Sequence, residues 1–170
     1  MHRLGMDYNL ALCFAPVDLD TANGATGLRI SMRDYESIDF LFIKAVGNAG
    51  DDPDLDVQCH NAYTGGTTAD LDVVTEFWYQ QEATLDGDEN WARTTQTAAS
   101  EVDLGTDCAE LQGMYVVHVE ASQLPAGYDW VSINCAVTTA VAQLGASIAI
   151  LNRPKYAASP DKLLQVLNNA

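Results

Sequence analysis

Short apolar runs that alternate with polar residues, each closed by turn-forming residues, constrain the fold of this chain more than any other feature of its sequence. In residues 130–137, Val131, Ile133, Cys135 and Val137 occupy every second position, which is the period of a β-strand with one buried face. Further runs carry strand composition at residues 9–14, 28–32, 38–46, 55–59, 73–81, 91–97, 114–120 and 145–151. Short strands without long helices between them predict an all-β protein, either a two-layer sandwich or a barrel.

Two of these runs allow a finer prediction. The run at 38–46 is apolar on both faces except for Asp39 and Lys44. Strands of this kind are covered on both sides, so we expect it at the centre of the structure. The run at 9–14 is expected to end at Ala15, because Pro16 cannot donate a ladder hydrogen bond.

The length and composition favour one folded unit. A chain of 170 residues with 48% apolar content can bury one sizeable core, so residues 1–170 are expected to form a single domain. Within it we expect residues 1–8 to form an N-terminal arm and residues 153–170 a C-terminal tail. The tail carries a capping serine, a proline suited to a first helical turn and a leucine stripe, at Ser159, Pro160, Leu163, Leu164 and Leu167. These signals predict a short C-terminal helix.

The charge of the chain is strongly acidic and unevenly distributed. The net charge is -16, which disfavours binding to phosphate backbones and to anionic lipid surfaces. Residues 51–110 hold fifteen acidic residues and one basic residue, Arg93, whereas the two flanking segments are nearly balanced. The acidic middle is interpreted either as a solvated surface or as a surface turned away from an interface, with the balanced ends facing a partner.

Membrane, secretion and redox signals are weak. Residues 131–151 contain no charged residue, but their polar side chains and alternation favour a strand over a membrane span. No signal-peptide apolar stretch is present near residue 1, so this segment is expected to be retained. The cysteines have no close pair and no histidine at ligand spacing, so buried, reduced thiols and cytoplasmic synthesis are expected for Cys13, Cys59, Cys108 and Cys135.

No catalytic or cofactor motif is recognised. His2, His60 and His118 lie far apart, and neither a nucleophile elbow nor a phosphate-binding loop is present. The acidic run at 51–56 lacks the glycine and glutamate spacing of an EF-hand loop, and the run at 86–90 is equally weak, so no metal site is predicted. We therefore expect no enzyme activity and no cofactor.

Four segments resemble auxiliary head proteins of tailed bacteriophages, the decoration or cement proteins that coat an assembled capsid. These segments are residues 8–18, 47–53, 124–130 and 148–156. The resemblance extends over most of the chain and lies in the general pattern of the sequence rather than in a catalytic or ligand-binding motif. It implies a jelly-roll-like β-sandwich, a homotrimer, and a place on the outer capsid surface of the virion, with the major capsid protein as partner and without nucleic acid or membrane.

The low net charge of the two end segments suggests where such a capsid contact would lie. The candidate interface residues are Arg3, Leu4, Met6, Tyr8, Arg153, Lys155, Tyr156 and Lys162. Two other functions stay open at this point. One is a receptor- or glycan-binding head-fibre module, since exposed aromatic residues can bind sugars. The other is a small carboxylate-dependent hydrolase, because two acidic side chains brought together can cleave a glycosidic bond.

Overall fold

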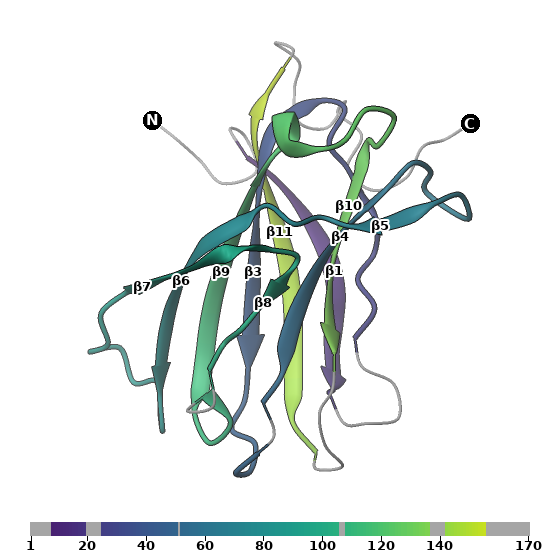
Figure 1. Ribbon diagram of the computed structural model, residues 1–170. Helices are drawn as coiled ribbons and strands as arrows, with labels where there is room; N and C mark the ends of the chain where they lie inside the picture. The colour runs from purple at the N-terminus through teal and green to yellow at the C-terminus, as the bar shows by residue number, and fades with distance from the viewer. Residues whose placement is uncertain (1–7, 20–24, 51, 106–107, 137–141, 156–170) are drawn as a thin grey trace.

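The computed structural model describes residues 8–19, 25–50, 52–105, 108–136 and 142–155 (Figure 1). Within these ranges the chain forms strands joined by turns, with a short 3-10 helix η2 at Ala121–Gln123. The strands are β1 Asn9–Asp18, β2 Ile30–Ser31, β3 Tyr35–Lys44, β4 Asp54–His60, β5 Thr68–Asp70, β6 Val74–Glu82, β7 Ala92–Ala99, β8 Glu101–Val102, β9 Gln112–Glu120, β10 Trp130–Ala136 and β11 Leu144–Pro154.

The strands form two antiparallel sheets. The six-stranded sheet has the order β1-β11-β3-β9-β6-β7, and the five-stranded sheet has the order β2-β10-β4-β5 with β8 paired to β4. Every run predicted as a strand lies in one of these sheets, so the prediction of an all-β protein is confirmed. Two very short strands, β5 and β8, were not predicted, because two or three residues carry no readable period.

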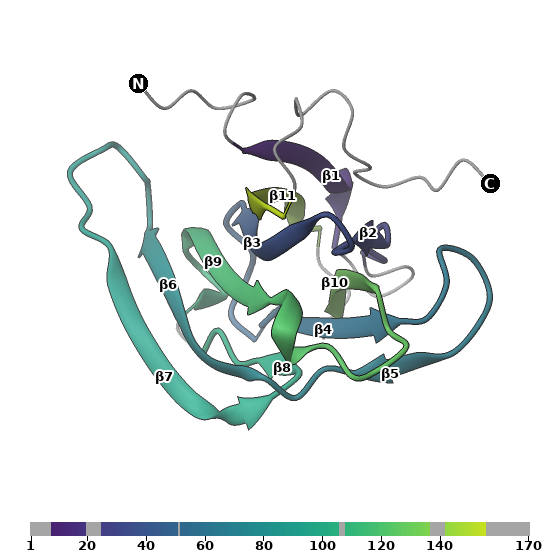
Figure 2. The ribbon, with the colours of Figure 1, turned by 90° about the horizontal axis from the view of Figure 1, so that it is seen from above.

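The chain passes between the sheets at one side of the molecule. Seen from above, it runs from β5 in one sheet directly into β6 in the other (Figure 2). The Leu71 amide donates to the Val57 carbonyl at 3.0 Å, and the Val57 amide donates to the Ser100 carbonyl at 3.0 Å. At the opposite side the Leu28 amide donates to the Cys13 carbonyl at 2.8 Å. The chain itself therefore joins the sheets on the first side, and a backbone hydrogen bond joins β1 to the segment before β2 on the other side.

One hydrophobic core fills the space between the sheets. Alternation places Phe40 and Phe42 of β3 opposite Val57 of β4, and all three are fully buried. Burial of a side chain of this size contributes about 1.5–3 kcal/mol to folding. The four cysteines are buried thiols as predicted, and burial raises the pKa of Cys13 to about 12, which keeps that thiol protonated and unreactive.

Two detailed expectations were wrong. β1 continues through Pro16 to Asp18, because it is an edge strand with register shifts near this point, and an edge position tolerates a missing donor. β3 is central in its sheet, as expected, but it is not covered on both sides: Ile43 on its outer side is 42% exposed.

The predicted helix near residues 159–167 lies outside the described residues, as do the first seven residues of the predicted arm. Within the described ranges, no helix has the length and apolar character needed to cross a membrane.

Candidate functional site

The outer side of the six-stranded sheet carries an unusual set of side chains. Alternation along each strand points one set inward to the core and the other set outward. The outward set on five neighbouring strands also contains polar residues, among them Asp39, Gln80 and His118. Its apolar members form what we call the apolar face: Leu10, Leu12, Leu41, Ile43, Trp78, Met114, Val116, Leu144, Ala146, Ile148 and Ile150. These residues are exposed or half-buried.

The pairing register joins five of these residues into one continuous row. In the central row Leu12 is paired with Ile148, Ile148 with Leu41, Leu41 with Val116, and Val116 with Trp78. Directly paired residues on one face of a sheet are close enough for their side chains to touch. The row therefore forms an unbroken apolar band across five strands, and it ends at Arg93 of β7, the partner of Trp78.

The exposure of this band is too extensive to be incidental. Leu12 is 47% exposed, Trp78 is 45% exposed and Leu144 is 58% exposed. Single exposed apolar residues are common on soluble proteins, but a contiguous exposed apolar patch marks a site of interaction. Among the described residues, nothing covers this face.

A shallow apolar pocket deepens one end of the face. It has a volume of about 370 Å³ and is lined by Pro16, Ile43, Lys44, Ala45, Leu85, Gln112, Leu144, Gly145 and Ala146. Leu85 comes from the loop between β6 and β7, where its amide donates to the Gln112 Oε1 atom at 3.1 Å. This hydrogen bond holds the loop against β9, so the pocket wall joins the apolar face without a break.

The opposite end of the same sheet, beside η2, is polar. The His118 Nδ1 atom lies 2.5 Å from the Asp39 Oδ1 atom, and the His118 Nε2 atom lies 3.1 Å from the Glu120 Oε1 atom. Both carboxylates raise the pKa of His118, with the Asp39 hydrogen bond as the largest cause. Because ionised carboxylates only accept hydrogen bonds, this geometry favours the imidazolium form, in which both ring nitrogens of His118 donate. The Asn152 Nδ2 atom also donates to Asp39, at 2.6 Å.

Arg153 completes this polar cluster from β11. Its guanidinium lies 2.6 Å from Glu120 and 3.8 Å from Glu36. Arg153 has a φ of 50°, which is uncommon for a residue with a side chain. The two carboxylates contribute to holding this conformation.

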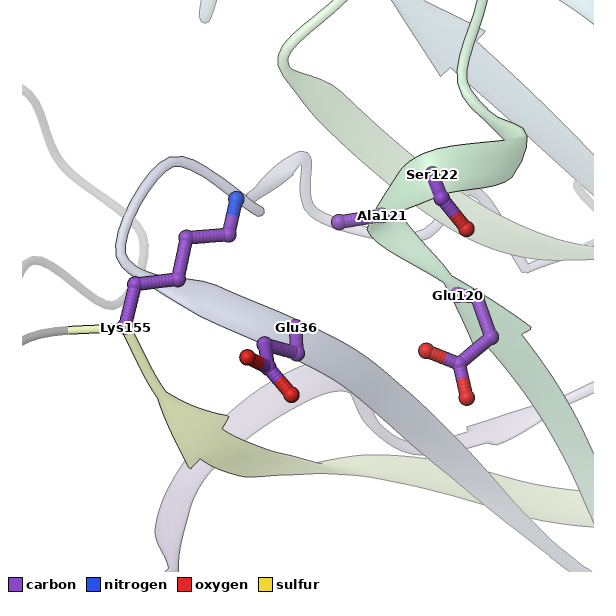
Figure 3. A pocket seen from close by; sticks show the side chains of 5 residues that line it. All are labelled: Glu36, Glu120, Ala121, Ser122 and Lys155. Atoms are coloured by element: carbon purple, nitrogen blue, oxygen red, sulfur yellow. The ribbon is translucent and has the colours of Figure 1, made fainter.

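The polar cluster borders an open pocket of about 440 Å³ lined by Glu36, Glu120, Ala121, Ser122 and Lys155. Figure 3 shows the Lys155 side chain turned away from both carboxylates, and its ammonium donates to the Met32 carbonyl at 3.0 Å. A glycosidase needs one carboxyl group whose pKa is raised so that it can donate a proton. Here the hydrogen bond from His118 lowers the pKa of Glu120, which is the opposite of what a general acid requires.

The outer side of the five-stranded sheet has the contrasting character. Asp54 and Asp56 of β4 point outward beside Asp70 of β5 and Glu101 of β8, and we call these four residues the acidic face. Burial, and then neighbouring negative charges, raise the pKa of Asp54 and of Asp56. Like charges on this face therefore repel one another, and no basic residue is placed among them in register.

One group of acidic side chains has the proximity of a metal site. Ligand oxygens of Glu82, Asp88 and Glu89 lie within 4.8 Å of one another. The Glu89 carboxylate, however, accepts the amides of Asp86 at 2.7 Å and Gly87 at 3.1 Å, and these hydrogen bonds lower its pKa. Glu89 therefore stabilises the turn between β6 and β7, and the group carries no metal assignment.

The basic residues in the described part of the chain are all bound within the molecule. Arg29 donates to the Ala62 carbonyl, and the buried Lys44 donates to the Cys108 carbonyl at 2.6 Å. Arg33, Arg93 and Arg153 form ion pairs with acidic residues, and Lys155 donates to a backbone carbonyl. The described surface therefore offers no basic patch to a phosphate group.

Three of the eight predicted interface residues lie in the described part of the chain. Tyr8, which is 36% exposed, directly precedes β1 at the margin of the apolar face. Arg153 and Lys155 lie at the polar end of the same sheet. The other five, Arg3, Leu4, Met6, Tyr156 and Lys162, lie outside the described residues.

The apolar face itself was not predicted from the sequence. Its signal was present in the run at 38–46, which is apolar on both sides, but that pattern was interpreted as a strand covered within its own chain. An exposed apolar face and a covered one have the same sequence pattern, so only the strand order separates the two cases.

The chain is thus an all-β protein of two antiparallel sheets with one apolar and one acidic outer face. No known protein family matches its sequence, and no curated protein matches it. Among solved structures it is similar to the crystal structure of SPBc2 prophage-derived protein YomS, with a TM-score of 0.40 and 10% sequence identity over 85% of this chain and 93% of that chain. A likeness at this level does not transfer a function.

Proposed function

We propose that this chain is a non-catalytic structural protein that works through surface contact, as a decoration protein on the outer surface of a tailed-bacteriophage capsid. The observation that carries the proposal is the apolar face, an unbroken band across five strands that the described part of the chain leaves uncovered. An exposed apolar surface of this kind lowers the solubility of the protein unless another molecule binds it. The resemblance of the sequence to phage head proteins supplies the capsid as the setting.

The polar groups near the apolar face support a structural role rather than a chemical one. His118 is engaged by Asp39 and Glu120, and Arg153 is engaged by Glu120. Within this cluster, the hydrogen bond from His118 lowers the pKa of Glu120, which is the opposite of what a general acid requires. The geometry therefore favours a contact surface over the carboxylate-dependent hydrolase.

Binding to an assembled shell would be useful in itself. A ligand that binds only the assembled state stabilises that state by about 2.7 kcal/mol per site when its concentration is 100 times its Kd. The finer features of the proposal follow the resemblance: jelly-roll connectivity, a homotrimer, and contact with the major capsid protein through the segments around Tyr8 and Arg153.

The test is co-sedimentation of the purified protein with capsids assembled from the major capsid protein of the phage that encodes this chain. We expect saturable binding, and a higher denaturant concentration for disassembly of decorated capsids than of bare ones. Deletion of residues 1–8 is expected to lower the occupancy. Absence of co-sedimentation would refute the capsid role, while unchanged occupancy after the deletion would refute the contact through this segment.

A further inference from the structure

We propose that the apolar face is the surface through which copies of this chain bind one another; the inference rests on the structural role proposed above and names the partner at that surface. The first argument is electrostatic. At a net charge of -16, two copies repel each other over most of their surfaces. A contact between them therefore requires a surface on which acidic residues do not meet.

The apolar face meets this requirement. Its charged neighbours are compensated, since Asp39, which lies in the row of Leu10 and Ile150, is paired with His118, and Arg93 lies 3.2 Å from Glu76. The central row from Leu12 to Trp78 contains no charged residue. Two copies of the acidic face, by contrast, would bring Asp54, Asp56, Asp70 and Glu101 against their own counterparts, and juxtaposed like charges oppose association.

The composition of the face also suits a partner identical to itself. In a two-fold dimer the same patch meets itself, and around a three-fold axis one part of the patch can meet another part of it, so in both cases the patch must complement itself. An uncharged apolar patch is self-complementary without any requirement for pairing of donors with acceptors. A partner protein with a different surface composition would not require an uncharged binding site. Basic side chains on such a partner would bind the acidic face more strongly than the apolar face.

The size of the face suits a weak, reversible contact. Its eleven residues each cover about 4.8 by 6.8 Å of sheet, or about 360 Å² on each copy. Two such faces bury about 700 Å² in projection, which is at the low end for protein interfaces and agrees with an association that dilution reverses. The pocket beside Leu85 and Leu144 adds a recess into which a side chain of the second copy can fit.

The test measures the mass of the purified full chain by sedimentation velocity, without capsids, over a range of protein concentrations. We expect a dimer or a trimer that dissociates on dilution. The variant Leu12→Asp, at a position 47% exposed on the face, is expected to weaken association by about tenfold or more. The matched control is Leu28→Asp, at a position 44% exposed in the segment before β2, which is expected to leave association unchanged.

A second variant, Ile43→Asp, and circular dichroism of all the proteins separate lost association from lost folding. The inference would be overturned if the unaltered chain is a monomer at every concentration. It would also be overturned if Leu12→Asp and Ile43→Asp both remain folded and still form the oligomer. A monomer that still co-sediments with capsids would overturn the self-association alone. An oligomer that fails to bind capsids would overturn the capsid role alone.

Discussion

The two sheets have the same alternation and share one core, yet their outer sides are opposites. On the six-stranded sheet the outward residues form an apolar band centred on Leu41. On the five-stranded sheet the outward residues of β4 include Asp54 and Asp56, and Asp56 is in register with Glu101. The inner sides of both sheets are predominantly apolar, with a few buried polar residues such as Lys44 and Ser147.

This contrast separates the demands of folding from the demands of function. Folding requires an apolar inner side on each sheet, because burial of that side stabilises the protein. It places no such requirement on the outer sides. The acidic side chains keep one face in water, whereas the apolar residues of the other face gain free energy only when a second molecule covers them.

The largest effect is expected at His60 of the five-stranded sheet, whose ring nitrogens each lie 2.9 Å from a hydroxyl group of Thr68 or Ser132. Burial, and then the charge of Arg29, lower the pKa of His60 to about 4. Between pH 6.5 and 4 the unfolded chain gains a proton at His60 that the folded protein does not, so the free energy of unfolding falls, by on the order of 3 kcal/mol. Urea unfolding at pH 7 and pH 4.5 measures this loss.

The variant His60→Gln controls for the other titrating groups, because it keeps a neutral polar side chain at the site. It is expected to lose much less stability than the wild-type protein over the same pH interval. Equal losses in the two proteins would show that His60 is not the source.

His118 of the six-stranded sheet should respond to pH in the opposite direction. Its pKa is raised in the folded protein, chiefly by Asp39, so its contribution is fully present below pH 6.5 and is lost as the pH rises through the raised pKa. The ring is 47% exposed, and solvent screening limits the effect to about 1 kcal/mol. His118→Gln should therefore be less stable than the wild type at pH 6, with a smaller difference at pH 9. A constant difference would contradict this assignment.

On the acidic face, Asp56→Asn is expected to stabilise the protein at pH 7. Burial, and then the charges of Asp70 and Glu101, raise the pKa of Asp56, so the ionised carboxylate destabilises the fold. Removal of one charge from the pair with Glu101 should add about 0.2–1 kcal/mol to the free energy of unfolding. The gain should shrink as the pH falls through the pKa of Asp56, and thermal unfolding at several pH values measures it.

The smallest effect on folding is expected on the apolar face. Leu12→Ser and Leu144→Ser should change the free energy of unfolding of the monomer by no more than about 0.5 kcal/mol, because both residues are exposed. Unfolding has to be measured at a protein concentration where the monomer predominates, since association adds stability. The buried Val57→Ala is the comparison, with an expected loss above 1 kcal/mol. A large loss at Leu12 would mean that the face serves folding.

Much of the strand map was predictable from particular residues. The alternation of Val131, Ile133 and Cys135 identified β10, because a period of two needs only local information. The extension of β1 past Pro16 was not predictable, because it depends on the position of β1 at an edge of the sheet. The polar cluster was equally hidden, since Asp39, His118 and Arg153 are far apart in the sequence and meet only through the order β11-β3-β9.

By itself the sequence determined an all-β, acidic protein with buried cysteines and no recognisable catalytic motif, because period, charge and residue type are local properties. Only the tertiary structure decided that the apolar residues on the second side of β3 remain exposed and join those of four neighbouring strands. The physical reason is that burial depends on what packs against a strand, and that neighbour is set by long-range pairing rather than by the strand itself.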